Sequence, residues 1–234
     1  MKDLSKNLEK EGYDLLDGTL REQRLLQIWR KRFNNPIESL ASSIHHIFNT
    51  TTPLGTTTST ALDVVSNASQ ELKFNIGITV LEDILSKNNL GKLDLGTKIS
   101  SGKKVEISYS NAFSETVEQL DLENFLAASD FVHPNPGVLK DLNRDNLIVI
   151  TGVVYAKNLK AIIESESEID ASIDTEVNAI IGGKIGFTRE STTKIVLTAP
   201  LGETFPIAIK YHKMRFRNGE FKKLVLVSDS KDWF

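Results

Sequence analysis

Two long runs of alternating apolar and polar residues constrain the fold of this chain more than any other feature. In the first run, every even position from 72 to 80 is apolar: Leu72, Phe74, Ile76, Ile78 and Val80. In the second run, Ile169, Ile173, Val177 and Ile181 occupy odd positions, with Ala or Thr between them. Because successive side chains of a β-strand point to opposite faces, both runs predict amphipathic strands.

Each run has a neighbouring segment with which it can pair. After the first, Leu93 to Tyr109 resumes the alternation, with Val105 and Ile107 on the apolar face. After the second, Gly182-Gly183 ends the strand and Ile185 to Leu197 returns with weaker alternation. Residues 70–109 and 159–197 are therefore two predicted hairpin regions. A further hairpin is expected between Phe205 and Val227, because Asn218-Gly219 is a strong turn signal.

Helical patterns lie between these strands. A capping box at Thr19 and Glu22, followed by apolar residues three and four apart, predicts a helix over 19–33. Further helical segments are expected at 37–48, 81–91, 121–129 and 137–143, a polar loop at 50–60, and a fully buried strand at 147–155. We therefore expect an α+β fold: a twisted, mainly antiparallel sheet with flanking helices, in a single domain spanning residues 1–234.

Composition and motifs exclude several classes. The 234 residues contain no Cys, so disulfides and thiol chemistry are excluded, and the net charge is −3. The first eleven residues lack the apolar core of a secretory signal, so a cytoplasmic protein is expected. The histidines, at 45, 46, 133 and 212, show no metal-ligand spacing, and no nucleophile or phosphate-loop motif is present. We expect no enzyme activity, no metal and no cofactor.

Two basic patches suggest different partners. The first is the polar face of the 19–33 segment, which carries Arg21, Arg24, Arg30, Lys31 and Arg32 opposite Trp29. A basic face opposite aromatic residues can lie on anionic lipid, although a core-packed helix with a solvated face has the same pattern. The second is the terminal hairpin, where Lys210, Lys213, Arg215, Arg217, Lys222 and Lys223 accompany Tyr211 and Phe216. Interleaved basic and aromatic residues can bind nucleic acid or an acidic protein, which is the alternative function.

The length of the second alternating run affects whether its strand could cover a core or cross a membrane. Residues 169–181 would extend about 40 Å as a strand. A tilted strand of roughly nine to eleven residues is enough to cross a bilayer, and this run of thirteen residues is longer. An amphipathic strand normally covers a core, and that remains the simple interpretation. Two such hairpins could instead join a membrane barrel shared with copies of the chain, with one face towards lipid. The other face would then be an acidic, water-facing surface of Glu166, Glu168, Asp170, Asp174 and Glu176.

The order of these features resembles the gasdermin pore-forming domain. The segments that carry the resemblance are Ile28-Trp29-Arg30-Lys31-Arg32-Phe33 before Ile37-Glu38-Ser39-Leu40; Val138 to Leu142 leading into Asn146 to Val154; and Pro200 to Ile209. In that family a basic N-terminal region binds acidic lipids, and two hairpin regions refold from a compact α+β state into transmembrane strands of an oligomeric pore. The family usually carries a C-terminal inhibitory domain, whereas only Ser228 to Phe234 follows the last expected strand here.

The resemblance implies a gasdermin-like protein that permeabilises membranes and causes cell death, cytoplasmic when inactive and at the membrane when active. It implies an acidic phospholipid membrane, further copies of the chain and a restraining regulatory protein as partners, and no nucleic acid. Expected lipid-binding residues are Arg21, Arg24, Trp29, Arg30, Lys31 and Arg32. Expected membrane-inserting residues are Leu72, Phe74, Ile76, Ile78, Val80, Val105, Ile107, Ile169, Ile173, Val177 and Ile181; expected pore-lumen residues are Glu166, Glu168, Asp170, Asp174 and Glu176.

Overall fold

One long strand, β9 (Leu147–Ser165), organises the sheet. The computed structural model describes residues 8–15, 23–34, 37–60, 68–72, 99, 102–132, 135–175 and 186–227. The other strands are β1 (Asp14–Leu15), β2 (Ile28–Arg30), β3 (Glu38–Ala41), β4 (Phe48–Asn49), β5 (Thr57–Thr60), β6 (Ala68–Leu72), β7 (Gly102–Thr116), β8 (Asp130–Phe131), β10 (Gly186–Ser191), β11 (Lys194–Thr198), β12 (Thr204–Arg217) and β13 (Glu220–Leu226). The helices described over their whole length are α5 (Gln119–Ala128), α6 (Pro136–Asn143) and the 3₁₀ turn η1 (Ile44–His46), and residues 8–10 and 172–175 are also helical.

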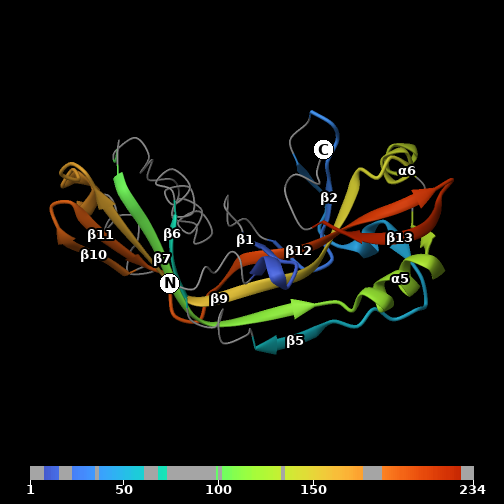
Figure 1. Cartoon of the computed structure of the whole chain (residues 1–234), viewed down its shortest axis with the longest axis horizontal. Helices are drawn as coiled ribbons and strands as arrows, with labels where there is room; N and C mark the ends of the chain where they lie inside the picture. The colour runs from blue at the N-terminus through green and yellow to red at the C-terminus, as the bar shows by residue number, and fades with distance from the viewer. Residues whose placement is uncertain are drawn as a thin grey trace.

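β9 changes neighbours along its length. Its first half pairs with β12 and its last residues, from Lys160 to Glu164, pair with β11, while β7 runs along the other edge. Asn111 of β7 and Asn158 of β9 both adopt positive φ near this change, and the Asn158 side chain donates to Ser110 Oγ at 2.8 Å. As a result β10, β11 and β6 lie at one end of the molecule and α5, α6 and β13 at the other (Figure 1). Every pairing between described strands is antiparallel, so the expected α+β fold with a mainly antiparallel sheet is confirmed.

The buried side chains form separate clusters at the two ends. The hairpin-end cluster consists of buried residues of β7, β9, β11 and β12 together with Leu8, Tyr13, Ile99, Ile169, Ile173 and Ala199. The helix-end cluster joins α5, α6, η1 and β4 to β2, the start of β9, and the β12–β13 hairpin. A third, smaller group around Ile148, Ile150 and Tyr211 lies against Trp29 and Tyr155. The described parts of both hairpin regions thus pack at an end of the molecule that has its own core.

Several predicted elements are confirmed with shifted ends. The expected helices at 121–129 and 137–143 are α5 and α6, and α6 begins with Asn135 capping the amides of Gly137 and Val138. Asn218 and Gly219 adopt positive φ between β12 and β13, as a tight hairpin turn requires. β9 is buried along its first eight residues, as expected for a strand covered on both faces.

Other predictions were wrong. Residues 23–33 of the expected 19–33 helix contain strand β2, which pairs with β9 and β3. Leu26 takes a positive φ of 63°, and its amide donates to Ile150 of β9, so pairing with the sheet replaces the helix there. Instead of a helix, residues 37–48 form β3, η1 and the start of β4. The polar segment 50–60 ends in strand β5, which pairs with β7. The segments 73–98 and 176–185, which include the predicted helix at 81–91, lie outside the described residues.

His212 makes stability depend on pH. Its buried ring lies with Nδ1 2.8 Å from Thr151 Oγ1, and burial, aided by Lys210, lowers its pKa from 6.5 to about 4. The unfolded chain gains a proton on this ring below about pH 6.5, whereas the folded chain does so only near pH 4. We therefore expect thermal stability to fall from pH 6.5 towards pH 4. His212→Gln should flatten this part of a plot of Tm against pH, and parallel curves for the two proteins would contradict the assignment.

Candidate functional site

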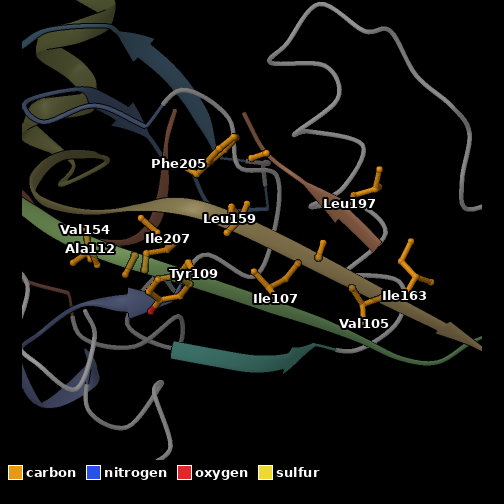
Figure 2. Close-up of a cluster of buried hydrophobic side chains, with 14 of the residues drawn as sticks. Val105, Ile107, Tyr109, Ala112, Val154, Leu159, Ile163, Leu197, Phe205 and Ile207 are labelled. Atoms are coloured by element: carbon orange, nitrogen blue, oxygen red, sulfur yellow. The ribbon is translucent and has the colours of Figure 1, made fainter. Parts of the chain in front are cut away.

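Four of the predicted membrane-inserting residues, drawn from both hairpin regions, are packed together in the interior. Val105 and Ile107 of β7 and Ile169 and Ile173 of the second region all belong to the hairpin-end cluster, and none is more than 7% exposed. Figure 2 shows Val105 of β7 beside Ile163 of β9, with Ile107 further along β7 and Leu197 of β11 in the same cluster. The structure therefore brings the two distant hairpin regions into one shared core. Phe74, Ile76, Ile78, Val80, Val177 and Ile181 lie outside the described residues, and Leu72 is placed only by its backbone pairing with Val105.

This shared core contains an unsatisfied polar atom. The hydroxyl oxygen of Tyr109 is buried, and no hydrogen-bond partner lies near it in the described part of the chain. Burial raises the pKa of this phenol well above its ordinary value. An unpaired buried hydroxyl destabilises the folded chain by about 1–3 kcal/mol. This cost would be removed if the Tyr109 hydroxyl reached water or a hydrogen-bond partner.

The second hairpin region does not continue as a strand after β9. Residues 166–170 are irregular and residues 172–175 are helical, so the strand predicted from Ile169 is not formed over the described residues 169–175. Ile169 lies just before the helical turn and Ile173 lies within it, and both side chains are buried in the hairpin-end cluster. We call residues 166–175 the folded segment. Its backbone is tied to the turn between β10 and β11, because Ile169 N–H donates to Thr192 O at 2.8 Å.

Arg189 of β10 holds this folded segment by side-chain contacts. Its Nε and Nη2 donate to the Asp174 carboxylate at distances between 2.6 and 3.0 Å. Nη1 donates to Ile169 O and Nη2 to Asp170 O, each at 3.1 Å. The hydrogen bond to Asp174 raises the pKa of Arg189, so the guanidinium remains charged. We call this set of contacts the Arg189 clasp.

The predicted pore-lumen residues do not form a continuous face in this structure. Glu166, Glu168 and Asp170 are exposed on the folded segment, whereas Asp174 is half-buried and bound by Arg189. Glu176 lies outside the described residues. An even-numbered acidic face would exist only if the segment became a strand.

The predicted lipid-binding residues lie near the start of β9, at the opposite end from the hairpin regions. Two of them are already paired: Arg32 makes a bidentate contact to the Asp141 carboxylate at 3.0 and 2.7 Å, and Arg30 contacts Glu38 at 2.7 Å and Asp141 at 3.5 Å. Asp141 is buried in α6, and the hydrogen bonds from Arg32 hold the pKa of its carboxyl below the usual range. These two arginines therefore fasten β2 to α6, a structural role that sequence analysis missed.

The other predicted lipid-binding residues differ in their surroundings. Trp29 packs partly buried against the third cluster and so is not a free aromatic anchor. The backbone amides of Arg24 and Lys31 bond to Gln27 Oε1 and Asn146 O, respectively. Arg21 lies outside the described residues.

Sequence analysis overlooked an exposed apolar tip beside these cations. Phe33 is 78% and Ile37 is 43% exposed, and both lie in the connection between β2 and β3, which begins with Lys31. We call Lys31, Phe33 and Ile37 the β2–β3 tip. The turn residues Asn34-Asn35-Pro36 after Phe33 were the available sequence signal for a loop there.

The terminal basic hairpin is less suited to nucleic acid than its sequence suggested. Tyr211 and Phe216 are buried, so the proposed aromatic contacts to bases are wrong for this structure. Arg215 and Arg217 both contact Asp145, and Lys222 pairs with Glu220.

Within the described residues, no helix is long and apolar enough to span a membrane.

Comparison of the sequence with known proteins finds a matching family model and similar curated proteins. The sequence model of the Bacterial Gasdermin Family matches residues 16–220. The chain is 24% identical over 168 residues to Gasdermin bGSDM from a Desulfuromonadales bacterium, covering 69% of this chain and 61% of that protein. It is 25% identical over 163 residues to Gasdermin bGSDM from Vitiosangium sp., covering 68% and 60%. The chain therefore spans about three fifths of the length of these curated relatives.

A solved structure shares the fold. A bacterial gasdermin from Bradyrhizobium tropiciagri superposes with a TM-score of 0.60 at 14% sequence identity, over 96% of this chain and 91% of that one. This likeness concerns the arrangement of the chain, while the family match rests on sequence. The family model covers most of the residues, and on that evidence the chain belongs to the bacterial gasdermin family.

Proposed function

We propose that this protein docks on acidic membranes, assembles with copies of itself and permeabilises the bilayer, leading to cell death. One observation carries the proposal: in a member of the bacterial gasdermin family, the described apolar residues of two separate hairpin regions are buried in one shared core. Strands that alternate apolar and polar residues can bury such a face either in a core or in lipid. The compact structure is then the inactive, cytoplasmic form, and a regulatory protein would act by preserving it.

Docking begins at the β2–β3 tip. Exposed aromatic and aliphatic side chains next to a lysine suit the boundary between lipid headgroups and acyl chains. Anionic headgroups attract the cation, contributing about 1 kcal/mol for each Lys or Arg near the surface. Arg30 and Arg32 contribute mainly by fastening the tip to α6, because Asp141 and Glu38 already bind them.

Insertion requires the second hairpin region to rearrange. In the compact form β10 folds back and pairs with β11, while β11 also pairs with the end of β9. A continuous strand over 186–198 cannot keep this fold-back, so β10 must leave β11. Residues beyond Ser165 would then extend β9, placing Ile169 and Ile173 towards lipid and Glu166, Glu168, Asp170 and Asp174 towards water.

Dye release from liposomes tests this function. We expect the purified chain to release dye from vesicles that contain phosphatidylglycerol and to act much more slowly on pure phosphatidylcholine. Replacing Lys31 and Phe33 together (Lys31→Gln, Phe33→Ser) should slow release by about fivefold or more, since one cation and one apolar contact are lost.

A matched control uses another exposed apolar residue. Leu201→Ser changes a side chain that is 92% exposed in the turn before β12, away from the tip, and should leave release unchanged. Equal loss in the tip and control variants would contradict docking by the tip. Absence of release from both kinds of vesicle would contradict a pore former that acts without a trigger.

A further inference from the structure

We propose that the Arg189 clasp is the latch that keeps the second hairpin region closed, so that its release precedes membrane insertion. The inference rests on the proposed function and adds to it a specific point of control. It begins from the convergence of one side chain on three parts of the folded segment: the backbone carbonyls of Ile169 and Asp170 and the carboxylate of Asp174.

The clasp bridges two pieces of chain that must separate. Arg189 belongs to β10, which pairs with β11, whereas its partners follow β9. The side chain is only 20% exposed and that of Asp174 32% exposed, so solvent screens the pair less than it screens a surface ion pair. Charge-assisted hydrogen bonds in a fork geometry are among the stronger contacts available to side chains.

The clasp lies over the residues that the proposed mechanism needs. Ile169 is 4% and Ile173 is 1% exposed, and both are held in the hairpin-end cluster by the same segment that Arg189 binds. Opening the segment would expose these two side chains together with the cluster beneath them. Apolar surface exposed in this way is stabilised when it moves from water into the apolar interior of a bilayer.

The placement of Arg189 along its strand gives independent support. The odd positions from 187 to 197 are Phe187, Arg189, Ser191, Thr193, Ile195 and Leu197, so Arg189 is the one charged residue on that face. On the lipid side of a barrel strand, an arginine costs roughly 2–4 kcal/mol at mid-membrane and less near the interface. Arg189 is thus unfavourable in the extended form and has its partners in the closed form, as expected of a latch.

Hydrogen exchange tests the latch without reference to pore formation. Asp174→Asn removes the ion pair, and Arg189→Leu removes every contact of the clasp. In both variants we expect the amides of Ile169, Ile173 and Asp174 to exchange at least about tenfold faster than in the wild-type chain. Glu190→Gln is the control, because it breaks the Lys194–Glu190 pair on the same hairpin, 2.7 Å long, without touching the folded segment.

Dye release from phosphatidylglycerol vesicles then tests the consequence. If the latch limits insertion, Asp174→Asn and Arg189→Leu release dye faster than the wild-type and Glu190→Gln proteins. Unchanged exchange in Asp174→Asn overturns the latch, as does faster exchange with an unchanged rate of release from an active wild-type protein. If exchange accelerates but no protein releases dye, the proposed function fails and the clasp is only a folding contact.

Discussion

A disulfide bond between positions 188 and 196 is expected to abolish membrane permeabilisation. Thr188 of β10 and Val196 of β11 are register partners, and directly opposed residues in an antiparallel pair lie about 4.5–5.5 Å apart between Cα atoms. That separation suits a disulfide. The bond would hold β10 against β11, so the strand over 186–198 could not form. Because the chain has no cysteine of its own, Thr188→Cys with Val196→Cys introduces the only two thiols.

The measurement is dye release with and without a reductant. The oxidised double variant should release no dye, and reduction should restore release to the wild-type rate. Lys213→Cys with Val225→Cys makes the same crosslink between β12 and β13, outside both hairpin regions, and should remain active when oxidised. Full activity of the oxidised 188–196 protein would show that β10 and β11 stay paired in the pore.

Truncating Phe216 should cause the largest loss of stability among these substitutions. Its ring is 2% exposed and lies 5.6 Å from Phe48, 6.3 Å from Phe131 and 5.6 Å from Phe221, measured between ring centroids. These contacts join the β12–β13 hairpin to β4 and β8 in the helix-end cluster. We expect Phe216→Ala to lower the free energy of unfolding by about 3–5 kcal/mol, through lost burial and the cavity left behind.

Thermal unfolding measures this effect. For a chain of this size the expected loss lowers Tm by roughly 10 °C. Leu201→Ala is a suitable control, since that side chain is almost fully exposed and its truncation should leave Tm nearly unchanged. A similar Tm for Phe216→Ala and the wild-type chain would mean that the aromatic contacts at this end are not tightly packed.

Elements with strong local signals were predicted well. Asn218-Gly219 permits the positive φ values that the β12–β13 turn needs, and Asn135-Pro136 supplies a cap and a first residue for α6. The mainly apolar, β-branched run from Leu147 to Tyr155 favoured a strand buried on both faces. In these cases the preference resides in a few adjacent residues, so no distant partner was needed to make it visible.

The segment from 23 to 33 was mispredicted because its spacing fits two structures. Apolar residues at 25, 28, 29 and 33 suit a helix, yet Ile28 and Trp29 also suit opposite faces of a short strand. The choice was made by β9, whose Ile150 exchanges backbone hydrogen bonds with Leu26 and Gln27. The paired state of Arg30 and Arg32 followed from the same docking, which brought α6 and Asp141 within reach. Their charge was evident from the sequence, but Asp141, the partner that they share, lies more than a hundred residues away.

The alternating run from Ile169 shows most clearly what the sequence determines and what the tertiary structure determines. By itself the sequence determined that residues 169 to 181 carry an apolar set and an acidic set, and that the chain contains further strands able to pair with them. An alternating pattern places positions i and i+4 on one face in both a strand and a helical turn, so it does not choose between them. Tertiary structure made that choice for residues 172–175, because Arg189 and the hairpin-end cluster bind the helical turn in the compact form. The sequence thus specifies which surfaces must be covered, and only the three-dimensional packing determines what covers them.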